Sequence, residues 1–267
     1  MNRFEGKSIL VCGASSGIGK AAALRVAAEG ARVTAIGGPG DEQDLQATLA
    51  EMRADGRDVV AETIDVSTSE GARAAVAKAV EHGEGRLDSS IVTVGYIRYP
   101  DPFLDADIET FRRTFQVNVE ATFLLGQEAG RVMRDAGGGA IVNTSSTNAF
   151  MADEATVSFS AAKAAVSNLT RAMAIDLAPY GVRVNGVIPG MIRTRASAPM
   201  VENERFWDSY RLKIPMDRPG RVDEIAGLYA FLASDDASYM TGSMVLYDGG
   251  FSAGIRWRGW LDLDDGA

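Results

Sequence analysis

The sequence predicts one α/β domain in which a parallel sheet of about seven strands is covered by helices on both faces, the doubly wound arrangement. Three observations support this prediction. Short apolar runs alternate along the chain with stretches whose apolar residues recur at helical spacing. A glycine-rich turn joins the first apolar run to the first helical stretch. No linker, charge block or short repeat divides the 267 residues.

The elements follow one another in a regular order. Buried strands are predicted at residues 7–12, 32–36, 59–64, 91–94, 140–144, 182–187 and 244–247. Helices are predicted at residues 17–29, 42–55, 69–82, 108–135, 156–179 and 223–234. Helices between successive strands supply the right-handed crossovers that parallel pairing requires.

Two segments depart from this order. Residues 191–219 contain three prolines and are predicted to form a long excursion, that is, an irregular segment that passes over the sheet. Residues 255–267 are predicted to be a C-terminal tail that follows a domain of residues 1–254. Because Trp257 and Trp260 are difficult to bury within one subunit, we expect the tail to pack across a subunit interface.

The amino-acid composition argues against several classes of function. Lys and Arg number 27 against 36 Asp and Glu, a net charge of −9, which argues against nucleic-acid and membrane-surface partners. A single cysteine, Cys12, and a single histidine, His82, argue against a disulfide, a metal site and a Ser-His-Asp hydrolase. No apolar run is long enough to span a membrane and no signal-peptide pattern is present, so a cytoplasmic location is expected.

The glycine-rich turn carries the first functional signal. It lies between the first strand and a helix and reads Gly13-Ala14-Ser15-Ser16-Gly17-Ile18-Gly19. Gly13 permits the tight turn, Gly17 lets the backbone approach a pyrophosphate, and Gly19 lets the helix pack closely on the strand. The start of the helix presents free N–H groups to the phosphates. The turn therefore predicts a nucleotide site at the carboxyl ends of the strands.

Several further motifs share the order in which they occur in one family. They are Asp65-Val66 after the third strand, Asn118 within a helix, Ser145-Ser146 after the fifth strand, Lys163, the loop from Pro189-Gly190 to Thr194, and Asp248-Gly249-Gly250. With the glycine spacing, they resemble the short-chain dehydrogenase/reductase family over about residues 5–252. The resemblance implies a Rossmann-type fold, NAD or NADP as cofactor and a small-molecule substrate.

The resemblance also implies roles for individual residues. Ser146 would hydrogen-bond the substrate oxygen, Lys163 would bind the nicotinamide ribose, and Asn118 would hold a water of a proton relay. Asp65 would contact the adenine, and the loop ending at Thr194 would grip the carboxamide. The expected cofactor-binding set is Gly13, Ser15, Ser16, Gly17, Ile18, Gly19, Gly37, Asp65, Val66, Gly95, Lys163, Pro189, Gly190, Ile192 and Thr194.

Substrate and assembly are predicted from the same resemblance. Residues 191–219 correspond to the segment that covers the substrate, and an apolar pocket is expected from Met191, Met200, Phe206, Trp207 and Met216. Members of the family usually form tetramers through the long helices, here predicted at residues 108–135 and 156–179, so a homotetramer is expected.

The sequence departs from the family at the proton donor. The family pattern is Tyr-x3-Lys, but Phe159 stands four residues before Lys163. Phe159 follows Ser146 by thirteen residues, the usual interval to the tyrosine, so the alignment is in register. Phenylalanine has no hydroxyl and cannot donate the proton.

Two other positions depart as well. The sequence reads Val92-Thr93-Val94-Gly95 where the family has Asn-Asn-Ala-Gly, so the usual asparagine brace is absent. Gly37-Gly38 occupies the place where an Asp would select NAD or an Arg NADP, so the choice of cofactor stays open.

Three hypotheses follow. In the first, the protein interconverts a hydroxyl and a carbonyl on a small apolar substrate, and Tyr96, Ser160 or water replaces the missing hydroxyl; Tyr96 could instead be an aromatic wall. In the second, Phe159 was engineered from Tyr to trap a complex. In the third, the nucleotide pocket serves a regulatory or other non-redox role. Reduction of a conjugated double bond is a less favoured alternative.

Overall fold

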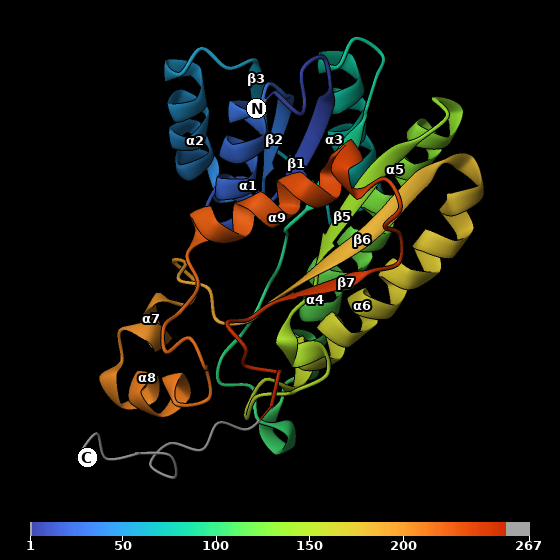
Figure 1. Ribbon diagram of the computed structural model, residues 1–267. Coiled ribbons are helices and arrows are strands. Elements are labelled where there is room, and N and C mark those ends of the chain that lie inside the picture. The colour runs from blue at the N-terminus through green and yellow to red at the C-terminus, as the bar shows by residue number, and fades with distance from the viewer. Residues whose placement is uncertain (1, 255–267) are drawn as a thin grey trace, which may run out of the picture.

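A seven-stranded parallel sheet forms the centre of the computed structural model, which describes residues 2–254. The strand order is β3-β2-β1-β4-β5-β6-β7. Figure 1 labels every strand of this sheet except β4. The strands are β1 (Ser8–Cys12), β2 (Arg32–Gly37), β3 (Val59–Thr63), β4 (Ser89–Val92), β5 (Gly139–Thr144), β6 (Val182–Pro189) and β7 (Met244–Tyr247). The predicted fold class is thereby confirmed. The order reverses between β1 and β4, which is where such sheets open a crevice for a ligand.

Helices cover both faces of the sheet. They are α1 (Gly17–Ala28), α2 (Glu42–Ala54), α3 (Ser69–His82), α4 (Ile108–Phe115), α5 (Ala121–Asp135), α6 (Val157–Leu177), α7 (Ala198–Val201), α8 (Glu204–Arg211) and α9 (Val222–Ala233). α1, α2 and α9 bury one apolar cluster that includes Leu45 and Tyr229. α3, α5 and α6 bury a second cluster on the opposite face, which includes Leu125 and Ala174. The five inner strands are therefore buried on both faces, which explains their apolar runs, whereas the edge strands β3 and β7 are only partly buried.

The prediction for the fourth strand was displaced by two residues. The strand covers Ser89–Val92, whereas residues 91–94 were predicted. The polar pair at its start is buried, and Ser89 Oγ donates to the carbonyl oxygen of Ala233 at 2.8 Å. Thr93 and Val94 lie beyond the strand and line the candidate site instead.

The predicted helix at residues 108–135 is two helices separated by one π-helical turn, Gln116–Glu120. The turn contains Asn118, which is fully buried. Its Nδ2 donates to the carbonyl oxygens of Thr114 at 2.9 Å and Tyr96 at 2.8 Å. Isolated π turns occur frequently at functional sites because they redirect one side chain without ending the helix.

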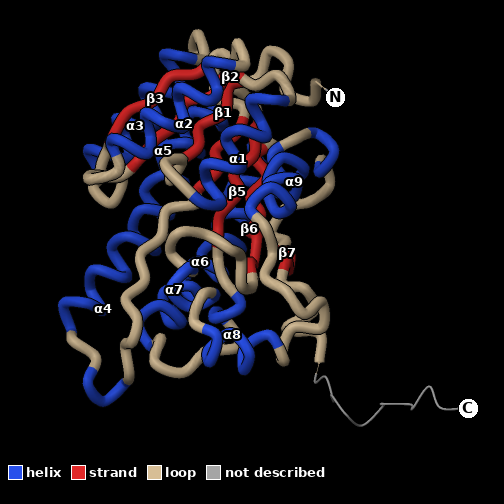
Figure 2. The backbone as a smooth tube through the Cα atoms, turned by 90° about the vertical axis from the view of Figure 1, so that its left-hand side faces the viewer, coloured by secondary structure: helices blue, strands red, loops and turns tan. Residues whose placement is uncertain are grey.

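The excursion predicted at residues 191–219 contains two short helices, α7 and α8. Both lie beyond the carboxyl end of β6 (Figures 1 and 2). Tyr210, Ile214 and Phe251 form a small separate core that holds this segment. The segment therefore lies at the carboxyl ends of the strands, the same end of the sheet at which the glycine-rich turn lies.

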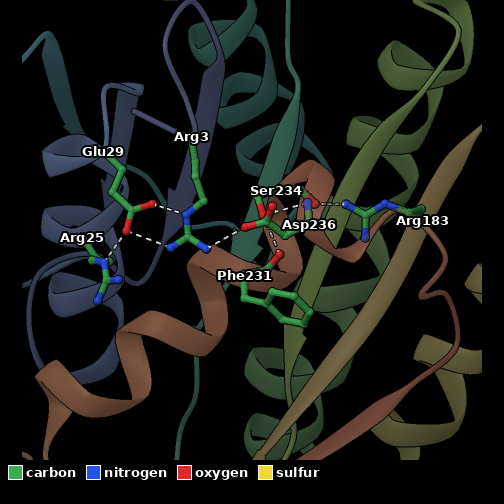
Figure 3. Close-up of polar contacts among 7 residues, drawn as sticks. All are labelled: Arg3, Arg25, Glu29, Arg183, Phe231, Ser234 and Asp236. Carbon is green, nitrogen blue, oxygen red and sulfur yellow. Dashed lines mark hydrogen bonds and ion pairs between the residues drawn. The ribbon is translucent and has the colours of Figure 1, made fainter. Parts of the chain in front are cut away.

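At the other end of the sheet, where the strands begin, charged side chains form a hydrogen-bonded network (Figure 3). Glu29 accepts hydrogen bonds from Arg3 and Arg25. Burial opposes ionisation of Glu29, but these two guanidinium groups outweigh it and lower its pKa. Arg3 also donates to Asp236, and Arg183 donates to carbonyl oxygens at the end of α9. These polar groups fasten the N-terminus, α1 and α9 to one another.

No helix among residues 2–254 is long and apolar enough to cross a membrane. Trp257 and Trp260, for which a role at an interface was predicted, lie outside the described residues.

Candidate active site

The glycine-rich turn leaves no room for larger side chains. A Cβ atom on Gly19 would lie 2.0 Å from the carbonyl oxygen of Gly13, and one on Gly13 would lie 2.7 Å from Thr93 Oγ1. Gly13 and Gly17 have positive φ angles of 90° and 57°. Ser16 begins α1 in an extended conformation, and its side chain does not cap the helix. The first N–H groups of α1 are thus left for another acceptor.

Thr93 fastens this turn to the end of β4. Its Oγ1 donates to the carbonyl oxygen of Cys12 at 2.8 Å and lies 3.4 Å from that of Gly13. Thr93 occupies one of the positions where the sequence lacks the family's asparagines. A hydroxyl rather than an amide therefore joins β4 to the turn.

The end of β2 carries a carboxylate that the sequence analysis missed. Ser15 Oγ donates to Asp41 Oδ2 at 2.9 Å, beside Gly37 and Gly38. Arg195 Nη2 lies 4.0 Å from Asp41 Oδ1, and its Nη1 is paired with Asp44. The signal was available in the Gly-Pro-Gly-Asp sequence after β2, because aspartate commonly follows such a turn at a helix start.

Asp65 and Val66 follow β3 and line the same cleft. Asp65 Oδ1 accepts from Ser67 Oγ at 2.6 Å and Ser67 N at 3.0 Å. The hydroxyl of Ser67 in particular holds the pKa of Asp65 below its usual value. Val66 is buried and offers an apolar surface next to this carboxylate.

Ser146 and Lys163 come together at the carboxyl end of β5. Ser146 begins a short 3-10 turn, and its Oγ accepts from Asn148 N at 3.2 Å. Lys163 is buried, its Nζ donates to the carbonyl oxygen of Thr144 at 3.0 Å, and burial lowers its pKa to about 8. Phe159 lies one turn earlier on α6, with its ring centroid 5.5 Å from Lys163 Nζ.

The side chains of Asn118 and Lys163 both lie close to Gly95. A Cβ atom on Gly95 would be 3.3 Å from Asn118 Oδ1 and 3.7 Å from Lys163 Nζ. Asn118 Oδ1 is buried and has no hydrogen-bond partner within residues 2–254. A buried acceptor without a partner is costly, so it marks a place for a further donor beside Lys163.

The two groups predicted as substitute proton donors differ in their surroundings. Tyr96 is half-buried and lines the cavity. Ser160 is not among the lining residues; its Oγ lies 2.9 Å from Thr156 Oγ1 and 3.4 Å from Asn148 Nδ2. The Ser160 hydroxyl is therefore engaged inside the protein, whereas Tyr96 faces the site.

The loop after β6 packs against the glycine-rich turn and forms one wall of the site. Gly190 N donates to the carbonyl oxygen of Tyr247 at 3.0 Å, and Ile192 is buried. A Cβ atom on Gly17 would be 3.3 Å from Thr194 Cγ2, so this loop contacts the turn directly. Thr194 N in turn donates to Ser197 Oγ at 2.9 Å.

These groups line two cavities that share part of their walls. A cavity of about 510 Å³ runs from Asp65 and Gly37 along the glycine-rich turn, and one of about 840 Å³ contains Ser146, Phe159 and Lys163. The residues shared by both are Ile18, Thr93, Val94, Gly95, Tyr96, Thr194 and Ala196. A long cleft of this kind, with free helix N–H groups at its middle, fits a dinucleotide.

The outer wall is more polar than predicted. Met191, Met200 and Phe206 line the larger cavity, but Trp207 packs in the small core and Met216 lines a separate cavity. Polar and charged side chains form much of the remaining outer wall, namely Asp153, Glu154, Asn203, Arg205, Ser209 and Lys213. These residues lie far apart in the sequence and carry no motif, which is why sequence reasoning missed them.

Comparison with known proteins gives a consistent result. A family model described as enoyl-(acyl carrier protein) reductase matches residues 13–252. The chain is 36% identical over 257 residues to L-rhamnose 1-dehydrogenase (NAD(P)(+)) of Sphingomonas sp. (strain SKA58), covering 96% of this chain and 100% of that protein.

Solved structures agree with this. A short-chain type dehydrogenase/reductase from Mycobacterium ulcerans superposes with a TM-score of 0.90 at 32% identity, over 94% of this chain and 92% of that one. A chain assigned as an NAD(P)-dependent gluconate 5-dehydrogenase from Beutenbergia cavernae, with bound NADP at low occupancy, gives 0.87 at 30% identity, over 95% and 100%. The chain therefore belongs to the short-chain dehydrogenase/reductase family and is an NAD(P)-dependent oxidoreductase.

Proposed function

We propose that the protein interconverts a hydroxyl and a carbonyl group on a small substrate, without the tyrosine that usually transfers the proton. The observation that carries this proposal is the position of Ser146 and Lys163. Both line the larger cavity, and Lys163 Nζ would lie 3.7 Å from a Cβ atom on Gly95, a residue that lines both cavities.

Different residues of the chain would bind the cofactor and the substrate. Bound NAD or NADP supplies or accepts the hydride at its nicotinamide ring. Gly13–Gly19 would hold the pyrophosphate, Asp65 and Val66 the adenine, and Lys163 the nicotinamide ribose. Ser146 Oγ would donate a hydrogen bond to the substrate oxygen, where negative charge develops in the reduction direction.

The proton needs another carrier because Phe159 has no hydroxyl. We assign it to Tyr96, a residue that lines both cavities, rather than to the engaged hydroxyl of Ser160. General acid–base catalysis typically contributes about 10²–10⁴-fold, so a less favourably placed donor still permits measurable turnover. In the enoyl-reductase branch of the family, the tyrosine stands seven residues before the lysine. Thr156 occupies that position here and has no phenol, and its hydroxyl donates to the backbone oxygen of Asp153, so double-bond reduction is less favoured.

Asp41 favours NAD over NADP. Its carboxylate lies at the end of β2 beside Ser15, where the adenosine ribose of a bound dinucleotide would lie. A ribose hydroxyl can donate to this carboxylate, whereas a 2′-phosphate would be repelled by it. Arg195 does not reverse this preference, because Asp44 already pairs with it.

A homotetramer is consistent with apolar side chains that one subunit leaves exposed. Phe123 of α5 and Ile175 of α6 are 46% and 74% exposed on helices through which family members associate. Light scattering at several protein concentrations tests this; a monomer at micromolar concentration would contradict it.

Two substitutions test the proposed chemistry. Phe159→Tyr restores a hydroxyl beside Lys163, and we expect turnover to rise by about 10²–10⁴-fold. Tyr96→Phe removes the assigned donor and is expected to lower wild-type turnover at least about tenfold. Reduction of NAD or oxidation of NADH is followed at 340 nm with panels of alcohols, ketones, aldoses and enones.

Matched controls and a binding measurement make the result decisive. Phe150→Tyr and Tyr180→Phe change exposed rings outside the cavity and should leave turnover unchanged. NADH binding is measured separately by fluorescence. Binding without turnover, even in Phe159→Tyr, would refute the oxidoreductase chemistry proposed here and favour a non-redox role for the pocket.

A further inference from the structure

The larger cavity has a polar end that the proposed chemistry does not use. Ser146 and Lys163 stand on its inner wall, at the ends of the strands. The outer wall comes from the loop before α6 and from α8 with the residues that follow it. There Asp153, Tyr210 and Lys213 line the cavity together.

Asp153 has a carboxylate without a partner. Its side chain is partly buried, and neither a hydrogen bond nor an ion pair to the carboxylate occurs within residues 2–254; the hydrogen bond from Thr156 goes to its backbone oxygen. Burial raises the pKa of Asp153, and the nearby charge of Lys213 only partly opposes this shift. Desolvated charges are normally paired in proteins, so this carboxylate lacks a donor that a ligand could supply.

Tyr210 and Lys213 add complementary groups. The Tyr210 ring is stacked between Phe206 and Phe251, at centroid distances of 5.3 and 5.5 Å, which fixes its position. Burial, together with the charges of Asp153 and Asp248, raises the pKa of its hydroxyl, which therefore stays protonated. Lys213 Nζ lies 5.7 Å from the same ring and has no ion pair within the described chain.

The charges of the outer wall cancel. Asp153 and Glu154 contribute two carboxylates, and Arg205 and Lys213 contribute two cations. A carboxylate-bearing substrate would meet as much repulsion as attraction there. A neutral substrate with several hydroxyl groups can donate to Asp153 and accept from Tyr210 and Lys213 at the same time.

We propose that Asp153, Tyr210 and Lys213 recognise the hydroxyl groups of a neutral polyhydroxylated substrate, a sugar or polyol, whose reacting carbon lies near Ser146. The assignment rests on the proposed hydroxyl–carbonyl chemistry and names its substrate class. An apolar alcohol of similar size would leave the Asp153 carboxylate desolvated and without a donor, so it binds less well.

The substrate class is tested by comparing three sets of compounds at equal concentration: neutral pentoses and hexoses, the corresponding aldonates, and cyclohexanol. We expect kcat/KM to be highest for a neutral sugar, by at least about tenfold, the discrimination that one charge-assisted hydrogen bond provides. A preference for cyclohexanol or for the aldonates would overturn the proposal.

Asp153→Asn tests the residue itself, since it removes the charge and keeps the size. We expect KM for the best sugar to rise about tenfold to a hundredfold, with kcat and the Kd of NADH nearly unchanged. Asp208→Asn, an exposed carboxylate of α8 paired with Arg211, is the matched control. An unchanged KM in a folded Asp153→Asn variant would overturn the role of Asp153.

A binding measurement separates this inference from the proposed chemistry. Calorimetric titration of the sugars into the protein saturated with NADH detects recognition without turnover. Sugar binding that Asp153→Asn weakens would support the recognition site even if no compound is turned over. Turnover of compounds without hydroxyl groups beyond the reacting one, with no sugar binding, would leave the chemistry intact and overturn the recognition site.

Discussion

The cofactor cleft and the substrate wall are built in different ways. In the cleft, closely packed backbone decides the shape: Gly19 lies against the Gly13 carbonyl, and Thr93 fixes the turn from β4. In the substrate wall, side chains decide it: Tyr210 stacks between two rings, and Asp153 comes from a separate loop. A backbone-built site tolerates few changes, whereas a side-chain-built site can change its ligand while the fold stays the same.

The strongest test of the backbone-built half is Gly19→Ala. The added Cβ would lie 2.0 Å from the Gly13 carbonyl oxygen, so the turn must move. We expect NADH affinity to fall by about tenfold to a hundredfold, because overpacking costs about 1–3 kcal/mol and displaces the N–H groups that bind the phosphates. Fluorescence titration with NADH measures this.

The control is Gly227→Ala within α9, where an added Cβ meets Arg25 at an ordinary 3.4 Å. This variant should bind NADH as the wild type does. Equal affinities in all three proteins would show that the turn is less rigid than the packing indicates.

Lys163→Met tests the buried lysine that lies where the cofactor cleft and the substrate cavity adjoin. Burial lowers the pKa of Lys163 to about 8, from about 10.5 in an unfolded chain. Below pH 8 the buried ammonium therefore destabilises the folded state, by up to about 3 kcal/mol, and the cost is relieved as the pH rises from 8 to 10.5. Lys163→Met should abolish turnover yet raise the free energy of unfolding at pH 7.

Denaturant unfolding at pH 7 and at pH 9.5 measures this effect. The wild type should gain stability over that interval relative to Lys163→Met. A parallel pH dependence in the two proteins would contradict a depressed pKa for Lys163.

Asp41→Asn tests the one place in the cleft where a side chain sets specificity. Removing the carboxylate at the end of β2 should improve binding of NADPH relative to NADH by about tenfold, because one charge repulsion near the surface costs about 1–2 kcal/mol. Dissociation constants for both cofactors give the ratio. Glu51→Gln, which changes an exposed carboxylate at the other end of α2, is the control; an unchanged ratio in Asp41→Asn would exclude Asp41 as the determinant.

Phe251→Leu is expected to have the smallest effect and to act on the substrate wall alone. It removes the ring that stacks on Tyr210 at 5.5 Å, a contact worth about 0.5–1.5 kcal/mol. KM for the substrate should rise about threefold to tenfold, with an unchanged Kd for NADH. A larger loss of NADH affinity than of substrate affinity would show that the two halves are coupled rather than separate.

The sequence by itself determined the sheet, the order of its elements and the glycine-rich turn. Apolar runs buried on both faces, such as Ile9 to Cys12, and glycines forced by close backbone contact leave a local pattern in the chain. It also placed Ser146, Phe159 and Lys163 in register, since fixed spacing on a strand end and one helix brings them together. The prediction was wrong at β4 and at the π turn, where buried Ser89 and Asn118 find partners that lie elsewhere in the fold.

Only the tertiary structure decided which side chains share the cavity. Asp41 meets Ser15 across a turn, and Asp153 faces Tyr210 and Lys213 from another segment. Such encounters depend on how loops pack at the carboxyl edge of the sheet, and no local periodicity encodes them. The local pattern of hydrophobicity sets the scaffold, whereas long-range packing sets the electrostatics of the site and with it the choice of ligand.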